Sequence, residues 1–452
     1  MQGANLLTGI FFSRSLSIQE FAFYNIFNSF VVYFQLFGDF GLAVSLVRQP
    51  QMPSEKSYRA VLTFQQIFAL FLFIIIFFVS PILVSFYKMP TSYIMIFYAI
   101  GITFSFMAFQ SVCNAKLEKE LNFKIISLIE SVQAISFLVL SVLAFSITLD
   151  LVSITVSITL RAFIGAFLSY FFVKIPIKPL FDLIEVLDRL KFSIFFQGTS
   201  FIFLIQSLVT PVLLLPLLGA RKTGLLVWAQ ITASYPIVII NALQRLYFPT
   251  LANSQDDSIK TNNEIFFFLV ISNTSTALLS FFFALNFSFL TEHIFGSKWL
   301  EASQVFPFFL AGNFFIATSS PLFTLINAQG RSKNAFIISL FWTTSTWIIS
   351  TPMIHFFGYF GFAVGWFIIQ TTNLPFWFYI NRQLNLKIFK LASFIWLAPS
   401  ILYFLLNLQN MIPNTVNFTL ILSNILISSS IFVGMIFIFS KKESFFNVKK
   451  VF

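Results

Sequence analysis

The sequence is poor in charge: only 10% of its 452 residues are Asp, Glu, Lys or Arg, whereas 58% are hydrophobic. A soluble protein of this length needs far more charge to stay solvated. The hydrophobic runs are continuous and do not alternate with polar residues, which excludes a membrane β-barrel. The shortage of charge therefore predicts an all-α, polytopic membrane protein.

Cysteine and histidine are almost missing. The single cysteine, Cys113, excludes an intrachain disulfide. The two histidines, His293 and His355, lie far apart and form no metal-binding motif, and the chain has no Gly-x-x-x-x-Gly-Lys-Ser/Thr phosphate loop. We therefore expect no metal, no cofactor and no ATP hydrolysis, and we expect that the protein is not an enzyme.

The apolar runs are each close to the roughly 20 residues that a helix needs to cross a bilayer. Read against the polar breaks between them, they predict about 14 spans. The first, before Arg14, is only about half the required length, so we interpret it as a truncated helix, with a short re-entrant or tilted segment as the alternative. The predicted spans are this short segment, 21–47, 60–87, 92–112, 125–148, 151–173, 192–218, 224–244, 264–290, 302–326, 334–355, 359–380, 393–409 and 416–440.

The basic residues test this segmentation. Of the 27 Lys and Arg residues, 21 fall on alternate loops, 5 fall on the opposite loops and Arg161 lies inside a span. Loops rich in Lys and Arg face the cytoplasm, so both termini are predicted to be cytoplasmic. The net charge of +11 reflects this asymmetry together with contact with anionic membrane lipids, and it does not indicate nucleic-acid binding.

The spans group into two halves. We predict an N-terminal lobe of six helices over 1–173, a second lobe of six helices over 192–380, and an extra pair of helices over 393–440. The polar stretch 174–191 holds two prolines followed by an amphipathic pattern, which predicts a cytoplasmic surface helix that links the two lobes. Repeated bundles of this kind are common in transporters, with the transport pathway between them.

Several segments, in order, resemble Wzx-type polysaccharide flippases of the MOP exporter superfamily. They extend from about Leu6 to Gly365, and their order and spacing are more specific than any one of them. The resembling segments are FFSRSLSIQEF (11–21), YFQLFGDFGLAVSLVRQ (33–49), NAKLEKELNFKIISLIESV (114–132), RLYFPTLANSQDD (245–257), FGSKWLEAS (295–303) and LINAQGRSKNA (325–335).

The resemblance implies a function and a fold. The implied function is to move an undecaprenyl-pyrophosphate-linked oligosaccharide across the bacterial cytoplasmic membrane by alternating access, in the synthesis of surface polysaccharide or O-antigen. The implied fold is two six-helix lobes around a central cavity. The partners would be this lipid-linked sugar and membrane lipids, and a coupling proton or sodium ion is possible. Alternatives are another MOP-type exporter, such as a lipid II flippase or a cation-coupled drug antiporter, and a membrane oligosaccharide polymerase or ligase.

Two charges lie deep in predicted spans, where an ionisable group is costly unless it is paired or faces water. Arg161 is near the middle of span six, where it would contact a pyrophosphate or an acidic sugar, or would anchor to backbone carbonyls or a carboxylate. Glu130 lies about six residues inside span five. It would carry a coupling proton or cation, or would pair with Arg161 or Lys124.

Three further charges are candidates nearer the span ends. Asp39, between Gly38 and Gly41, would line the cavity or satisfy backbone groups at a kink. Arg14 would attract the head group at the outer end of span one or mark the interface, and Arg245 would contact substrate or serve only as a topology charge. Polar side chains inside the spans are expected to supply some of the cavity lining; these are Gln65, Gln66, Gln110, Gln133, Gln197, Gln206, Asn241, Gln244, Asn313 and Gln370.

Overall fold

The computed structural model describes residues 2–39, 41–48, 52–148, 150–254, 257–384 and 387–408, and all regular elements in this part of the chain are helices. This confirms the all-α fold class. Eight helical segments among the described residues are long and apolar enough to cross a membrane. The predicted span 416–440 lies outside the described residues.

Two of these eight segments are long enough to cross a bilayer twice. They are Ser200–Asn253, with 54 residues, and Lys333–Leu384, with 52 residues. Their helices are interrupted at Gly219 and at Gly358, where φ is +77° and +60°. Glycine adopts this left-handed backbone without the steric cost that a Cβ atom imposes. The sequence predicted breaks between spans at these two places, and both breaks are confirmed.

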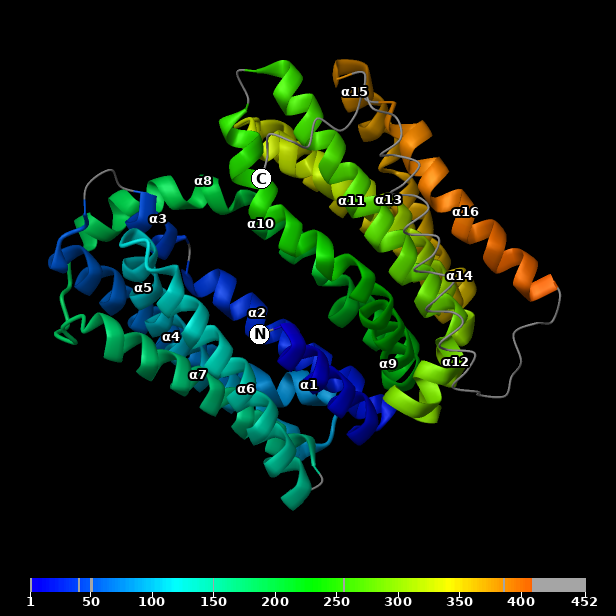
Figure 1. Cartoon of the computed structure of the whole chain (residues 1–452). Coiled ribbons are helices and arrows are strands. Elements are labelled where there is room, and N and C mark those ends of the chain that lie inside the picture. Colours follow the sequence, from blue (N-terminus) through cyan, green and yellow to red (C-terminus); the bar gives the residue numbers. More distant parts are fainter. Residues whose placement is uncertain are drawn as a thin grey trace. The chain divides into compact units, whose positions relative to one another are not determined.

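The chain divides into two compact units, Met1–Gly224 and Leu225–Phe452. In the first unit α4, α5, α6 and α7 lie side by side, α1 packs on α6, and α2 packs on α5 (Figure 1). The six-span lobes predicted from the sequence stay a prediction. The helices of the first unit are α1 (Gln2–Ser15), α2 (Ile18–Asp39), α3 (Leu42–Arg48), α4 (Glu55–Phe86), α5 (Ile94–Lys119), α6 (Phe123–Thr148), α7 (Leu151–Val173) and α8 (Leu183–Ser207), and α9 (Leu215–Ser234) continues into the second.

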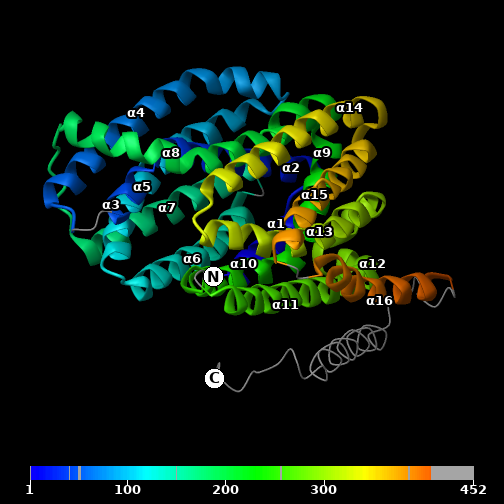
Figure 2. The ribbon, with the colours of Figure 1, turned by 90° about the horizontal axis from the view of Figure 1, so that it is seen from above.

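In the second unit α13 is the central helix. It packs against α10, α11 and α14, and α16 lies along α11 (Figure 2). A buried core of Leu, Ile, Phe and Trp side chains joins α11, α13, α15 and α16. The helices here are α10 (Val238–Asn253), α11 (Ser258–Leu285), the short α12 (Phe287–Phe289), α13 (Phe306–Ala328), α14 (Ser332–Thr371), α15 (Leu374–Leu384) and α16 (Ile388–Leu408).

Side-chain caps place several helix starts. Ser17 and Glu20 form a capping box at the start of α2, since the Glu20 carboxylate accepts from the Ser17 amide and the Ser17 hydroxyl accepts from the Glu20 amide. Asp150 caps α7 by accepting from the Val152 amide, which confirms the break predicted at this residue. Asp257 accepts two amides at the start of α11. Polar residues between apolar runs thus begin helices, because their side-chain oxygens accept hydrogen bonds from the free N–H groups of the first helical turn.

The segment FGSKWLEAS folds around a buried aromatic stack. The Trp299 ring stacks on Trp228 at 5.0 Å between centroids, with an interplanar angle of 8°, and both rings are at most 1% exposed. Phe295 packs edge-on against Trp228 at 5.6 Å. The positive φ of Gly296 (+111°) turns the chain between Phe295 and Trp299. This segment therefore supplies the aromatic core at one end of the second unit.

The linker predicted over 174–191 is only partly helical. Helix α8 begins at Leu183 and continues to Ser207, so the predicted surface helix and the start of span seven form one helix. Three side chains near the start of α4 hold the linker. Arg59 Nε donates to the Lys178 carbonyl at 3.0 Å, Thr63 Oγ1 accepts from the Leu180 amide at 2.9 Å, and Ser57 donates to the Glu185 carboxylate at 2.6 Å.

Glu185 gives this linker contact a pH dependence. The hydrogen bonds from Ser57 and from Arg189 lower the pKa of its carboxyl below the ordinary value. A lowered pKa in the folded state means that the carboxylate stabilises the fold above the pKa of the unfolded chain. That contribution is lost as the pH falls through the folded-state pKa.

Replacing Glu185 with Gln is expected to lower the thermal midpoint at neutral pH, because Gln keeps an acceptor oxygen but loses the negative charge. The gap to wild type should stay constant above the ordinary pKa of a glutamate and close as the pH falls below it. A thiol-reactive dye measures the midpoint, since Cys113 is buried until the protein unfolds. Glu55→Gln is the control because the Glu55 side chain is 63% exposed. A gap that also stays constant below that pKa would contradict this account.

Candidate functional site

Arg161 carries a charge near the middle of α7. Its side chain is half-buried, and its guanidinium carbon lies 5.1 Å from the centroid of the Phe137 ring on α6. Among the described residues, no carboxylate lies within 4.0 Å of it and its guanidinium makes no hydrogen bond. A cation over an aromatic face is attracted to the ring but keeps its N–H donors available. The side chain is therefore free to bind an oxyanion.

The Phe137 ring beside Arg161 belongs to a group of aromatic rings from three helices. The ring centroid of Phe12 on α1 lies 4.6 Å from that of Tyr24 on α2 and 6.0 Å from that of Phe137 on α6. We call Phe12, Tyr24, Phe137 and Arg161 the Arg161 cluster. Phe12 and Phe137 are buried, so the guanidinium is the part of this cluster that suits a ligand, and it suits an anionic one.

Two glutamines join the helices beside this cluster. Gln110 of α5 and Gln133 of α6 exchange two hydrogen bonds, at 3.0 and 3.1 Å. Gln133 Nε2 also donates to the main-chain carbonyl of Arg161 at 3.2 Å. The sequence identified both glutamines only as members of a group of polar residues inside the spans. That they meet each other and α7 is new from the structure.

Glu130 forms neither of the ion pairs considered from the sequence. Its side chain is half-buried on α6, and among the described residues no basic group lies within 4.0 Å of it. The distance in depth between Glu130 and Arg161, about 10 Å along ideal helices, agrees with this separation. The role of Glu130 as an ion-coupling residue stays a prediction.

The other three predicted site residues lie on helices other than α7. Arg14 is exposed in the last turn of α1, and Arg245 is exposed on α10. Asp39 is the last residue of α2, and its side chain lies outside the described part of the structure. Among the described residues, no group of three or more His, Cys, Asp or Glu side chains could hold a metal ion.

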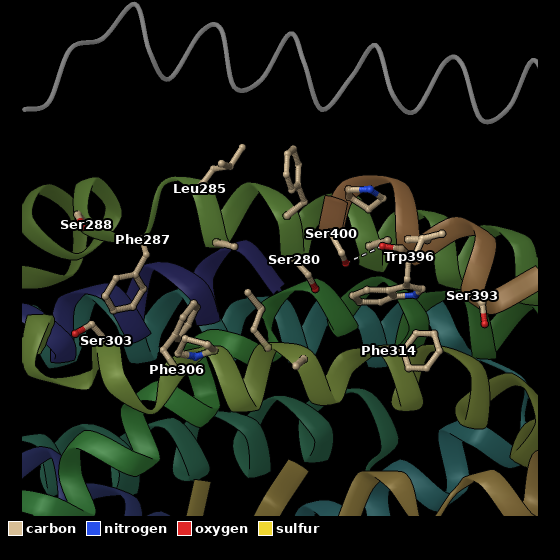
Figure 3. Close-up of a pocket in the computed structure, with 18 residues that line it drawn as sticks. Ser280, Leu285, Phe287, Ser288, Ser303, Phe306, Phe314, Ser393, Trp396 and Ser400 are labelled. Atoms are coloured by element: carbon tan, nitrogen blue, oxygen red, sulfur yellow. Dashed lines mark hydrogen bonds between the residues drawn. The ribbon is translucent and has the colours of Figure 1, made fainter. Parts of the chain in front are cut away.

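The second unit holds a pocket of about 750 Å³ between α11, α13 and α16 (Figure 3). Its described lining is apolar and aromatic, with scattered serines, and includes no ionisable side chain. Ser280 accepts a hydrogen bond from Asn313, and Ser400 donates to the Trp396 carbonyl. This pocket does not suit an anionic head group, so the Arg161 cluster is the better candidate for binding one.

Solved structures with the same fold are membrane transporters. The structure of the lipid II flippase MurJ in its inward closed conformation matches with a TM-score of 0.76, covering 97% of this chain and 96% of that one, at 16% identity. An inward-facing multidrug resistance MATE family transporter of the MOP superfamily matches with a TM-score of 0.62, covering 86% of this chain and 95% of that one, at 14% identity. At these identities the likeness shows the fold.

Two comparisons of sequence agree with the resemblance noted above. An uncharacterised membrane protein of the cps region of Klebsiella pneumoniae is 24% identical over 457 residues, which is 96% of this chain and 91% of that protein. The family described as polysaccharide biosynthesis protein matches residues 11–304, more than half of the chain. The resemblance to Wzx-type flippases is thus confirmed, and the chain belongs to the polysaccharide biosynthesis protein family.

Proposed function

We propose that the protein moves polyprenyl-pyrophosphate-linked oligosaccharide repeat units across the bacterial cytoplasmic membrane during the synthesis of surface polysaccharide, with both termini in the cytoplasm. The family match and the fold shared with a lipid II flippase support a lipid-linked flippase or exporter. The observation that carries the finer proposal is Arg161, a cation inside α7 with no carboxylate within 4.0 Å among the described residues.

The physical task explains why such a group is needed. A charged sugar head cannot cross roughly 30 Å of hydrocarbon unaided, whereas its polyprenyl tail can remain in the lipid. The protein must give the head a hydrated passage with cationic and hydrogen-bonding groups. An unpaired arginine costs a few kcal/mol inside a membrane, and binding an anionic substrate offsets that cost.

Deleting the gene in its own bacterium tests the proposal. We expect single repeat units to accumulate on the cytoplasmic leaflet and surface polysaccharide to disappear, both restored by a plasmid copy. The orientation of the lipid-linked units is measured with a probe that does not cross the membrane, applied to intact spheroplasts and to inverted vesicles.

The alternatives predict other outcomes. Loss of a polymerase or ligase would leave unpolymerised units on the outer leaflet. Loss of a lipid II flippase would block the synthesis of the cell wall. Loss of a drug antiporter would change drug sensitivity and leave the surface glycan intact. Normal surface polysaccharide after deletion, in a strain with no second copy of the gene, would overturn the proposal.

A further inference from the structure

The Gln110–Gln133 pair joins three helices at one level. Gln110 comes from α5 and Gln133 from α6, and the third hydrogen bond reaches the Arg161 carbonyl on α7. Gln133 is only 9% exposed, and both the oxygen and the nitrogen of its side-chain amide are hydrogen-bonded. A buried amide with its bonds satisfied has a defined orientation, since any rotation would leave polar groups unpaired.

The pair depends on a glycine of α7. Gly165 lies one turn after Arg161, and a Cβ atom there would lie 1.8 Å from Gln133 Nε2 and 2.4 Å from Gln110 Oε1. Real atoms cannot approach so closely, so any larger residue at 165 would force the two amides to move. The missing side chain therefore lets the amide pair lie directly on the α7 backbone.

Helix α6 contacts both parts of Arg161. Gln133 bonds its main-chain carbonyl, and Phe137, one turn further along the same helix, lies under its guanidinium. On α7, Arg161 and Gly165 are likewise one turn apart, so the two helices meet along matching faces. Contacts from α6 therefore reach both the backbone and the guanidinium of Arg161, while α5 contributes Gln110 to the same contact.

We infer that Gln110, Gln133 and Gly165 form a positioning element that fixes Arg161 for contact with the anionic head group. This inference rests on the proposed function, in which Arg161 contacts that head. None of the three residues needs to touch substrate. Their effect is to hold the guanidinium at one depth and one orientation, so that its N–H groups meet the oxyanion without reorganising.

A second amide contact in the same unit provides a matched control. Gln66 of α4 accepts from the Ser105 hydroxyl of α5 at 2.6 Å and donates to the Ser105 carbonyl at 3.1 Å. The sequence placed Gln66 among the possible cavity-lining residues, but both the oxygen and the nitrogen of its amide are bonded to Ser105. It is thus also a glutamine contact between two helices, and it does not involve α7. If such contacts only hold helices together, breaking either one should have the same consequence.

A double-mutant cycle with Arg161 distinguishes the two roles. Variants are expressed in the deletion strain, and surface polysaccharide made from its own repeat units is measured per molecule of protein. We expect Gln133→Leu to lower it about tenfold and Gln66→Leu to change it less than about twofold. In an Arg161→Gln background, Gln133→Leu should cause no further loss, because its effect passes through Arg161.

Further variants guard against misfolding. Gln110→Leu with Gln133→Leu removes both amides, so neither is left buried without its partner. Gly165→Ala should also lower surface polysaccharide, because its Cβ atom displaces the two amides. If this variant lowers the protein level as well, adding Gln133→Ala should restore that level by making space for the Cβ atom, but it should not restore transport. Losses that multiply in the Arg161→Gln background, or equal losses for the Gln66 and Gln133 variants, would overturn the inference. If wild-type protein restored no polysaccharide, the proposed function itself would be wrong.

Discussion

Replacing Arg161 with Gln is expected to lower surface polysaccharide at least about tenfold, while the amount of protein in the membrane stays the same. Gln cannot supply the charge or the paired N–H donors that an oxyanion binds. Folding should survive because, among the described residues, Arg161 makes no ion pair that the change would leave half-buried and unmatched. The measurement is complementation of the deletion strain, with polymer determined by antiserum or lectin and protein by immunoblot.

Two further variants sharpen this test. Arg161→Lys keeps the charge but loses the planar fork, so it should retain an intermediate amount of polymer. Lys260→Gln removes an exposed positive charge at the start of α11, and its polymer should match wild type. Equal polymer from the Arg161→Gln and wild-type proteins would remove Arg161 from the binding site.

Replacing Trp299 with Ala is expected to reduce the free energy of unfolding by about 3–5 kcal/mol. Trp299 is fully buried, and the change removes both its burial and its stacking on Trp228. The neighbouring rings cannot collapse fully into the space, so a cavity remains. We expect a large fall in the thermal midpoint of the purified protein. The midpoint is measured by monitoring the intrinsic fluorescence of the protein during heating.

Two controls accompany this variant. One keeps an aromatic ring at position 299, and the other removes an aromatic ring at an exposed position. Trp299→Phe retains a ring against Trp228 and should be clearly milder. Phe356→Ala deletes an aromatic side chain that is 73% exposed, and it should change the midpoint little. A Trp299→Ala protein as stable as the Phe356→Ala protein would show that the aromatic stack does not support the second unit.

The helices could be predicted from the sequence because membrane spans follow from local composition. Asp150 divides two apolar runs, and it caps α7 at the predicted place. Gly219 and Gly358 lie at the predicted ends of spans and adopt a positive φ there. Composition could not predict that α8 continues without a break from the linker into predicted span seven. The same residues could form one long helix or two helices that meet end to end.

The site could be predicted only in part. Arg161 is conspicuous because a charge in an apolar run is costly. Its neighbours are not: Phe137 is one of 68 phenylalanines, and nothing local distinguishes it from the others. Gly165 becomes meaningful only when α5, α6 and α7 are packed together, because its role is to leave space for side chains from other helices.

Because α8 is one unbroken helix, the end of the linker and the start of the seventh predicted span belong to the same element. Because the stretch from Leu183 to Ser207 is one helix, we expect a tilt at Ser207 to move Leu183 as well. A spin label on Leu187, which is 54% exposed, would thus report movement of the seventh predicted span during the transport proposed above.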